Sequence, residues 1–184
     1  TLSEGLEAIQ QSAFENCESL ESVNFPASLK MIDTSAFYNT GLKEVRLNEG
    51  LLLLGRLSFS SCESLTALYL PTSLRWVTVG NGGGGYKGIA TNCSALETIF
   101  IPDGLKLKCP VELYASDRLS EGIGFDALFS GTKIRESVAL QKMLREYGAV
   151  ESFRVGSLYL NTSSDEGKAF VALWRAYGSD SYAF

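Results

Sequence analysis

The fold is decided by the stretch at residues 6–26, which reads LEAIQQSAFENCESLESVNFP. Its apolar positions return in three further copies, which begin at Leu29, Leu51 and Leu74. The first three copies are 23, 22 and 23 residues long, and the fourth reaches 31 because extra residues enter around 81–87. A repeat of this length predicts a solenoid, in which each unit buries its apolar face only by stacking on its neighbours.

Each copy contains a short segment in which apolar and polar residues alternate. Such alternation, rich in β-branched and aromatic residues, predicts a strand. The four segments are 20–25, 42–47, 65–70 and 96–101. One strand per coil predicts a parallel sheet on one face of the solenoid, with its inner side in the core and its outer side in solvent. The Ala-Phe-x-x-Cys segment is expected to form the opposite wall.

Equivalent positions of successive copies are expected to lie above one another inside the solenoid. The expected structural ladder consists of Phe14, Phe37, Phe59, Cys17, Cys62 and Cys93. Free cysteine packs as a small hydrophobe, so we expect buried thiols. Cys62 and Cys93 fall on adjacent coils, and for this pair alone a disulfide remains an alternative to two free thiols.

The pattern resembles the BspA-like (treponemal-type) leucine-rich repeat. The Ala-Phe pair, the Cys three residues later and the closing Pro carry the resemblance, which covers about residues 2–104. The second copy departs from it at Thr40 and by a deletion, and the fourth has Ile89-Ala90 for Ala-Phe. The resemblance implies a non-enzymatic module that binds a protein partner, within a microbial cell-surface or secreted protein.

Composition excludes several classes of function. The chain has 184 residues, 45% of them hydrophobic and 20% charged, which suits a globular protein. Its net charge is −5 and it has no basic stripe, so neither nucleic acid nor an anionic membrane is an expected partner. No apolar run approaches the ~20 residues of a membrane span.

The sequence lacks histidine and the cysteine spacing that common catalytic and metal sites use. The chain has no histidine, which excludes Ser-His-Asp and Cys-His catalysis. Its four cysteines lack the paired spacing of a zinc site, and we expect no metal and no cofactor.

Two motifs resemble functional loops but fail on detail. The glycine run at 81–88 lacks the Gly-Lys-Ser/Thr of a phosphate loop and predicts a plain loop. Ser130 and Lys133 have the Ser-x-x-Lys spacing of serine acyl-transferases, but the chain has no Lys-Thr-Gly partner.

The pattern divides the chain at about Gly104. Residues 1–104 are expected to form the solenoid of about four coils, and 2–6 match 47–51, so we expect missing repeats upstream. Residues 105–184 are expected to hold a degenerate fifth coil at 129–134 and then either an α/β cap or a small domain.

A helix, a strand and a second helix are expected within this tail. The first helix is expected over 135–147 and the strand around 153–160. Phe170, Leu173, Trp174 and Tyr177 share one face of the second helix, which begins at a capping box at 163–166. Trp174 is expected in the core.

The candidate binding surface is the outer side of the sheet. One outward row is Asn24, Arg46, Tyr69 and Phe100, and Tyr and Arg dominate interface hot spots. The candidate contact residues are Arg46, Tyr69, Phe100, Glu44, Trp76 and Tyr86, the last two flanking the glycine run. Two interpretations of the aromatic pair stay open, because the tail could instead cover Phe100 with Tyr69 leaning on it.

Three functions are compatible with these features. The favoured one is a protein-binding or adhesion module that acts through the solvent face of the sheet. The second is a structural spacer for a domain missing upstream, and the third is an enzyme with its site in residues 105–184.

Overall fold

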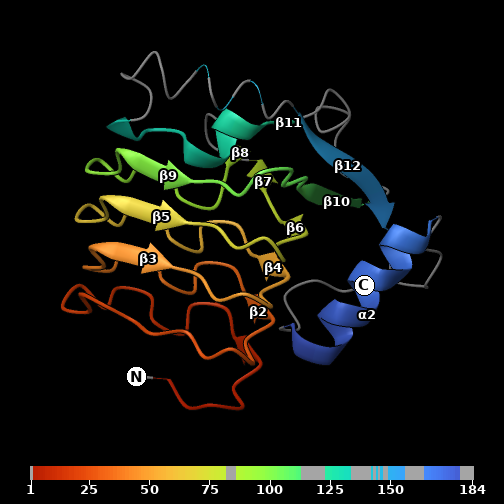
Figure 1. Ribbon diagram of the computed structural model, residues 1–184, viewed down its shortest axis with the longest axis horizontal. Coiled ribbons are helices and arrows are strands. Elements are labelled where there is room, and N and C mark those ends of the chain that lie inside the picture. Colours follow the sequence, from red (N-terminus) through yellow and green to blue (C-terminus); the bar gives the residue numbers. More distant parts are fainter. Residues whose placement is uncertain are drawn as a thin grey trace.

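The computed structural model describes residues 2–81, 86–112, 123–133, 142, 144, 146, 149–155 and 164–178. Coils stack one on another from the N-terminal end upward, and a C-terminal helix lies beside the stack (Figure 1). The fold is a leucine-rich repeat solenoid, as the repeat predicts.

The expected parallel sheet has three strands among the described residues. They are β3 (Glu44–Arg46), β5 (Ala67–Tyr69) and β9 (Thr98–Phe100). All pair in parallel and in register, so Val45 lies beside Leu68 and Leu68 beside Ile99. These central residues are buried, because every second side chain points into the core.

The strand expected at 20–25 does not form. This segment has no regular structure and joins the next coil by a hydrogen bond from the Lys43 amide to the Glu21 carbonyl, 3.2 Å long. Its apolar residues Leu20, Val23 and Phe25 are only half-buried and so hold the backbone less firmly.

A second sheet, which the sequence analysis did not predict, lies on another side of the stack. It runs in the order β1-β2-β4-β6-β10-β12-β11. Its members are β1 (Ala8–Ile9), β2 (Met31–Ile32), β4 (Leu53–Leu54), β6 (Trp76–Val77), β10 (Lys108–Glu112), β12 (Ala149–Val155) and β11 (Ile123–Gly124). All neighbours are parallel except β11 and β12. The first four strands have two residues each, too few to show an alternating pattern.

The phenylalanine ladder is confirmed. The rings of Phe14 and Phe37 stack with centroids 5.0 Å apart, and those of Phe37 and Phe59 with centroids 5.3 Å apart. Phe37 and Phe59 are fully buried. Phe25 packs edge-on against both of them.

The burial of a cysteine depends on the coil in which it lies. Cys62 and Cys93 are buried, and their thiols donate to the carbonyls of Phe37 and Phe59 at 3.2 and 3.1 Å. Contact with Cys62, together with burial, raises the pKa of the Cys93 thiol. Both thiols are free, so the alternative of a disulfide between Cys62 and Cys93 is not realised.

The inward position expected for Cys17 is wrong. This thiol is exposed, whereas its equivalents on later coils are covered from both sides. Phe14 of the same coil is only half-buried, so this coil is covered less than the later ones.

A further coil follows at Phe125–Lys133. It contains the 3-10 helix η2 (Phe125–Phe129). The Ala90 and Asn92 amides donate to the Leu128 and Ser130 carbonyls, the same bonds that join earlier coils. Thr132 donates to the Phe129 carbonyl as Thr40 does to that of Phe37. The division of the chain into a solenoid and a separate tail stays a prediction.

The tail agrees in part with expectation. The strand β12 ends at Val155 and adds to the second sheet beside β10, while Leu158 and Leu160 lie outside the described residues. Most of the helix expected over 135–147 also lies outside them. The helix α2 (Asp165–Tyr177) begins where predicted, with the Ser164 hydroxyl accepting from the Gly167 amide. Trp174 is buried, as expected.

The helix α2 covers the outer side of the second sheet. Met31, Leu53 and Trp76 lie in register on adjacent strands and form an apolar stripe along this side. Phe170 and Trp174 of α2 pack into the same cluster as the stripe. At the far end of the helix, the Gln10 side chain donates to the Tyr177 carbonyl at 2.7 Å. The helix lies obliquely beside the lower coils of the stack (Figure 1).

Candidate binding surface

The outer side of the three-stranded sheet carries the predicted row. The register places Arg46 beside Tyr69, and Tyr69 beside Phe100. The side chains at these positions follow one another across three coils. Asn24 is exposed in the coil below, outside any strand.

These three side chains form a continuous stack. The rings of Tyr69 and Phe100 are parallel to within 7°, with centroids 4.0 Å apart. The guanidinium carbon of Arg46 lies 3.5 Å from the centroid of the Tyr69 ring, a cation–π contact. Stacking in register limits the rotamers of all three side chains before any partner arrives. We call this group the Arg46–Tyr69–Phe100 stack.

The stack is open to solvent. Phe100 is 47% exposed and is the one exposed large hydrophobic side chain in the described part of the chain. The described part of the tail therefore does not cover Phe100. Tyr69 is half-buried because Arg46 and Phe100 flank its ring on both sides.

An ion pair orients Arg46 from a second direction. The Arg46 Nε donates to Glu44 Oε1, two residues earlier on the same strand. Among the described residues, no hydrogen bond involves the two terminal nitrogens of Arg46. Its side chain is 63% exposed, so these N–H groups can donate to a partner.

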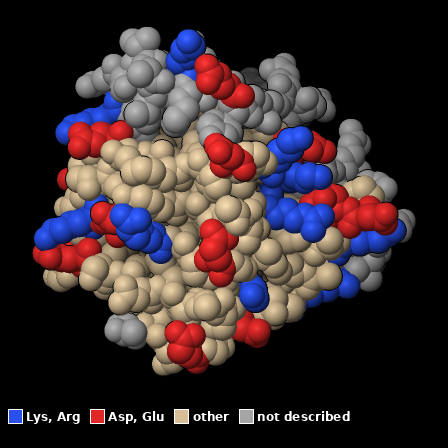
Figure 2. Space-filling model, in the orientation of Figure 1, with Lys and Arg blue, Asp and Glu red and all other residues tan. Residues whose placement is uncertain are grey.

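The surface around the stack has no single-sign field. Lys43, three residues before Arg46 in the chain, pairs with Glu21 at 2.6 Å. On the side of the molecule in Figure 2, basic and acidic side chains lie side by side at the two edges, and separate acidic groups lie on the uncharged surface between them.

One predicted contact residue, Trp76, does not join this surface. Trp76 is 3% exposed, because its ring packs edge-on against Phe170 of α2 at 5.9 Å, so its expected role as a surface contact is wrong. Tyr86 begins β8 (Tyr86–Lys87), which pairs with β7 (Gly80–Asn81). The side chain of Tyr86 and residues 82–85 lie outside the described part.

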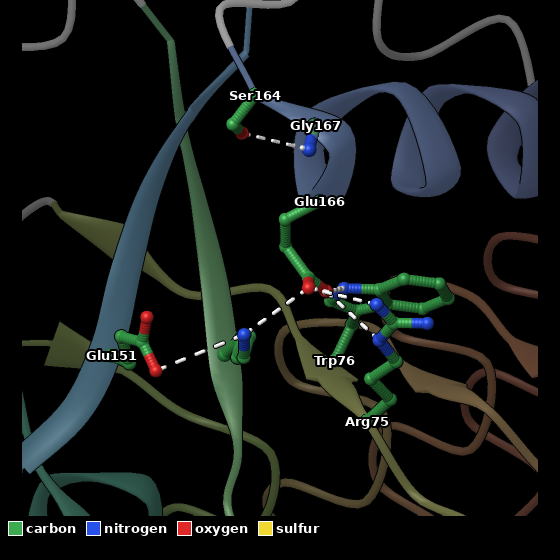
Figure 3. Close-up of polar contacts among 7 residues, drawn as sticks. Arg75, Trp76, Glu151, Ser164, Glu166 and Gly167 are labelled. Atoms are coloured by element: carbon green, nitrogen blue, oxygen red, sulfur yellow. Dashed lines mark hydrogen bonds and ion pairs between the residues drawn. The ribbon is translucent and has the colours of Figure 1, made fainter.

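A polar cluster that the sequence analysis missed fixes α2 to the solenoid. Glu166 points from the first turn of α2 toward Arg75 and Trp76 (Figure 3). Its carboxylate accepts from Arg75 at 2.8 and 2.9 Å, from the Trp76 indole at 2.5 Å and from Lys108 at 3.1 Å. The capping box predicted at 163–166 accounts for Glu166 within its own helix, and it does not indicate these contacts with Arg75, Trp76 and Lys108.

The cluster keeps Glu166 ionised. Burial by itself raises the pKa of this carboxyl, but hydrogen bonds from Arg75, Lys108 and Trp76 outweigh burial and lower the pKa to about 2. Each donor of the cluster comes from the outer side of the second sheet, on β6 and β10 or the residue before β6. The cluster therefore acts as a structural clamp between helix and sheet.

Among the residues that the structure describes, the remaining polar groups do not form a catalytic arrangement. Ser130 is the C-cap of η2, so it does not open a helix as the serine of acyl-transferases does. Within the described ranges, no three acidic or cysteine side chains are placed to hold a metal ion. None of the described helices is both long and apolar enough for a membrane span.

An open groove of about 280 Å³ lies between the turns at 71–75 and 102–106. Part of its polar lining is already engaged in the fold. Ser73 accepts from the Gly50 amide and donates to the Leu51 carbonyl, while Arg75 belongs to the clamp.

The stacked coils and their open sheet face define a leucine-rich repeat protein. The family described as "BspA type Leucine rich repeat region (6 copies)" matches residues 1–81, which confirms the resemblance. Residues 1–81 are therefore similar to a BspA-type leucine-rich repeat region. Leucine-rich repeats of this type are in general non-catalytic modules for protein interaction, and they are typical of surface or secreted bacterial proteins.

Comparison with known proteins adds one structure. A leucine-rich repeat protein from Bacteroides ovatus ATCC 8483 is 20% identical, with a TM-score of 0.43. The match covers 61% of this chain and 36% of that protein, so the chain spans well under half of its length. No protein of curated function matches the chain.

Proposed function

We propose that this chain is a binding module of a microbial cell-surface or secreted protein, where it takes part in adhesion by holding a protein partner. The contact surface is the outer side of β3, β5 and β9. Arg46, Tyr69 and Phe100 are its central contacts, and Glu44 holds Arg46 in place.

The exposed Arg46–Tyr69–Phe100 stack carries this proposal. Monomeric proteins rarely leave aromatic side chains in ordered, solvent-facing rows, and Tyr and Arg are the residue types enriched at binding hot spots. The three side chains hold one another in place, so binding costs less side-chain entropy than it does for free rotors. The opposite arrangement occurs on the second sheet, where α2 covers the apolar stripe.

A selection from displayed random peptides tests the proposal. Ligands selected on the wild-type protein are expected to lose binding to the double variant Arg46→Ala/Tyr69→Ala, whose melting temperature stays within a few degrees of wild type. The matched control is Lys43→Ala/Thr66→Ala, which alters exposed residues of the same sheet side outside the stack. Ligands that bind both double variants equally, or a selection that yields no ligand, would remove the proposal.

The cellular location is tested separately. An antibody against the folded module is expected to label intact cells of the source organism or its culture medium. A signal confined to the interior of lysed cells would contradict a surface or secreted location.

A further inference from the structure

We propose that Cys62 and Cys93 form a redox pair, which a small disulfide oxidises to a covalent link between the third and fourth coils. The structure shows the reduced state, in which both thiols are free. This inference rests on the packing of the coils and is independent of the proposed binding surface. The link stabilises the solenoid under oxidising conditions, such as those that secreted proteins meet.

The repeat places the two thiols at equivalent positions of adjacent coils. Cys62 belongs to the copy that begins at Leu51, and Cys93 to the copy that begins at Leu74. The Ser61 amide donates to the Thr91 carbonyl at 2.8 Å, so the backbones of the two coils are hydrogen-bonded beside the cysteines. Hydrogen-bonded parallel segments lie ~4.8 Å apart, and the Cα atoms of a disulfide are usually about 4.4–6.8 Å apart.

The sulfur atoms themselves are in contact. The Cys62 sulfur lies 3.2 Å from the Phe37 carbonyl oxygen and 3.2 Å from the Thr40 hydroxyl, both on the coil before it. The Cys93 sulfur repeats this placement one coil later, since it lies 3.1 Å from the Phe59 carbonyl oxygen. Cys62 takes the place of Thr40 in this second step, which brings the two thiols within hydrogen-bond range. A short approach of the two sulfur atoms then forms the bond.

No other two of the four cysteines share this relation. Cys17 and Cys62 are separated by a coil in which Thr40, which cannot be oxidised to a disulfide, holds the equivalent position. Cys109 lies on β10 of the second sheet. The stacked coils therefore contain one oxidisable pair.

The surroundings distinguish the roles of the two thiols. Hydrogen bonds with Cys93 and Thr40 outweigh burial and lower the pKa of the Cys62 thiol to about 7. The contact with Cys62 and burial raise the pKa of the Cys93 thiol. Cys62 is therefore the more ionised thiol and the first to attack. Both side chains are fully buried, so the reaction follows transient local opening.

The oxidation consists of two exchange steps. The Cys62 thiolate attacks one sulfur of oxidised glutathione and releases the first glutathione thiolate. The Cys93 thiol loses its proton, attacks the Cys62 sulfur of the mixed disulfide and releases the second glutathione thiolate. The protein gives up two electrons and two protons, and the oxidant becomes two glutathione thiols.

A redox titration of the full chain tests the inference. The variant Cys17→Ser/Cys109→Ala keeps only the proposed pair, and circular dichroism verifies that it is folded. It is equilibrated in glutathione buffers of increasing oxidised fraction, once native and once in concentrated urea. Acid-quenched samples are analysed by peptide mass spectrometry for the link between Cys62 and Cys93.

We expect the native protein to favour the link by roughly tenfold or more over the unfolded chain, because folding holds the two sulfurs in contact. By linkage, the oxidised variant is expected to melt several degrees above its reduced form. The matched control Cys93→Ser/Cys109→Ala keeps Cys17 and Cys62, which are two coils apart. For this pair, folding is expected to disfavour the link.

Three results would overturn the inference. The first is a Cys62–Cys93 link no more favoured in the native protein than in urea. The second is a lower melting temperature of the oxidised form. The third is an equal gain on folding for Cys17 and Cys62, which would show that contact between equivalent positions of adjacent coils is not the cause.

Discussion

At the scale of single residues, the Phe37 ring has contacts on every side. It stacks between Phe14 and Phe59, meets the edge of Phe25 and is fully buried. We expect Phe37→Ala to lower the free energy of unfolding by about 3–5 kcal/mol, because the cavity lies in mid-stack. The matched variant Phe14→Ala, at the half-buried end of the ladder, is expected to cost clearly less. Urea denaturation measures both, and equal costs would contradict the ladder.

The thiols predict a labelling pattern. Cys17 is exposed, whereas Cys62, Cys93 and Cys109 are buried. Burial raises the pKa of the Cys109 thiol to about 12, which leaves little reactive thiolate at neutral pH. We expect one cysteine, Cys17, to react rapidly with iodoacetamide in the native protein, as read by peptide mass spectrometry. Rapid labelling of native Cys17→Ser would contradict the buried positions.

Residue identity predicted position well wherever a coil has two neighbours. Equivalent positions of the repeat correctly predict the buried places of four side chains, which are Phe37, Phe59, Cys62 and Cys93. Cys17 has the same letter but not the same surroundings, since burial depends on the coils above and below and not on the residue alone. The same reason explains why Phe14 is only half-buried.

At the scale of elements, α2 is held by the Glu166 clamp. Replacing the carboxylate removes the charge that Arg75 and Lys108 face, so Glu166→Gln is expected to lower stability by about 1–2 kcal/mol. The matched variant Glu151→Gln removes a longer contact to Lys108, 3.8 Å, from a side chain 67% exposed. It is expected to cost under ~0.5 kcal/mol. Equal losses in thermal melts would contradict the clamp.

The clamp also predicts a pH dependence. The folded-state pKa of Glu166 is about 2, below the ordinary 4.5, so the unfolded chain takes up this proton first as pH falls. The stability that Glu166 contributes is therefore complete above about pH 5 and declines from pH 4.5 toward pH 2. The gap between wild type and Glu166→Gln is expected to narrow over that range. A gap that widens on acidification would contradict the assignment.

Element prediction succeeded where a pattern was long enough to see. The alternation of apolar and polar residues predicted β3, β5 and β9. The spacing of apolar residues every three or four positions predicted α2. The two-residue strands of the second sheet were too short for any period. The sequence also did not predict where α2 docks. An amphipathic face indicates that one side of a helix is covered, but it does not identify the element that covers it. Met31, Leu53 and Trp76, which share one position in successive copies, were the available signal.

At the scale of the whole molecule, α2 links the first coil, through Gln10, to β10, through Lys108. Both tryptophans of the chain, Trp76 and Trp174, are 3% exposed and lie in the contact between α2 and the second sheet. Tryptophan fluorescence therefore reports docking of α2, while circular dichroism reports the whole fold. We expect the two urea transitions to coincide, because the helix is part of one cooperative unit. A fluorescence change at clearly lower urea would contradict this.

The central claim is that the protein binds through the outer side of β3, β5 and β9. The most direct measurement is the footprint of a selected ligand in amide hydrogen exchange of the free and bound protein. We predict slower exchange at residues 44–46, 67–69 and 98–100, with the exchange of α2 unchanged. Protection confined to α2 or to the groove at 71–75 and 102–106, with these strands unaffected, would contradict the claim.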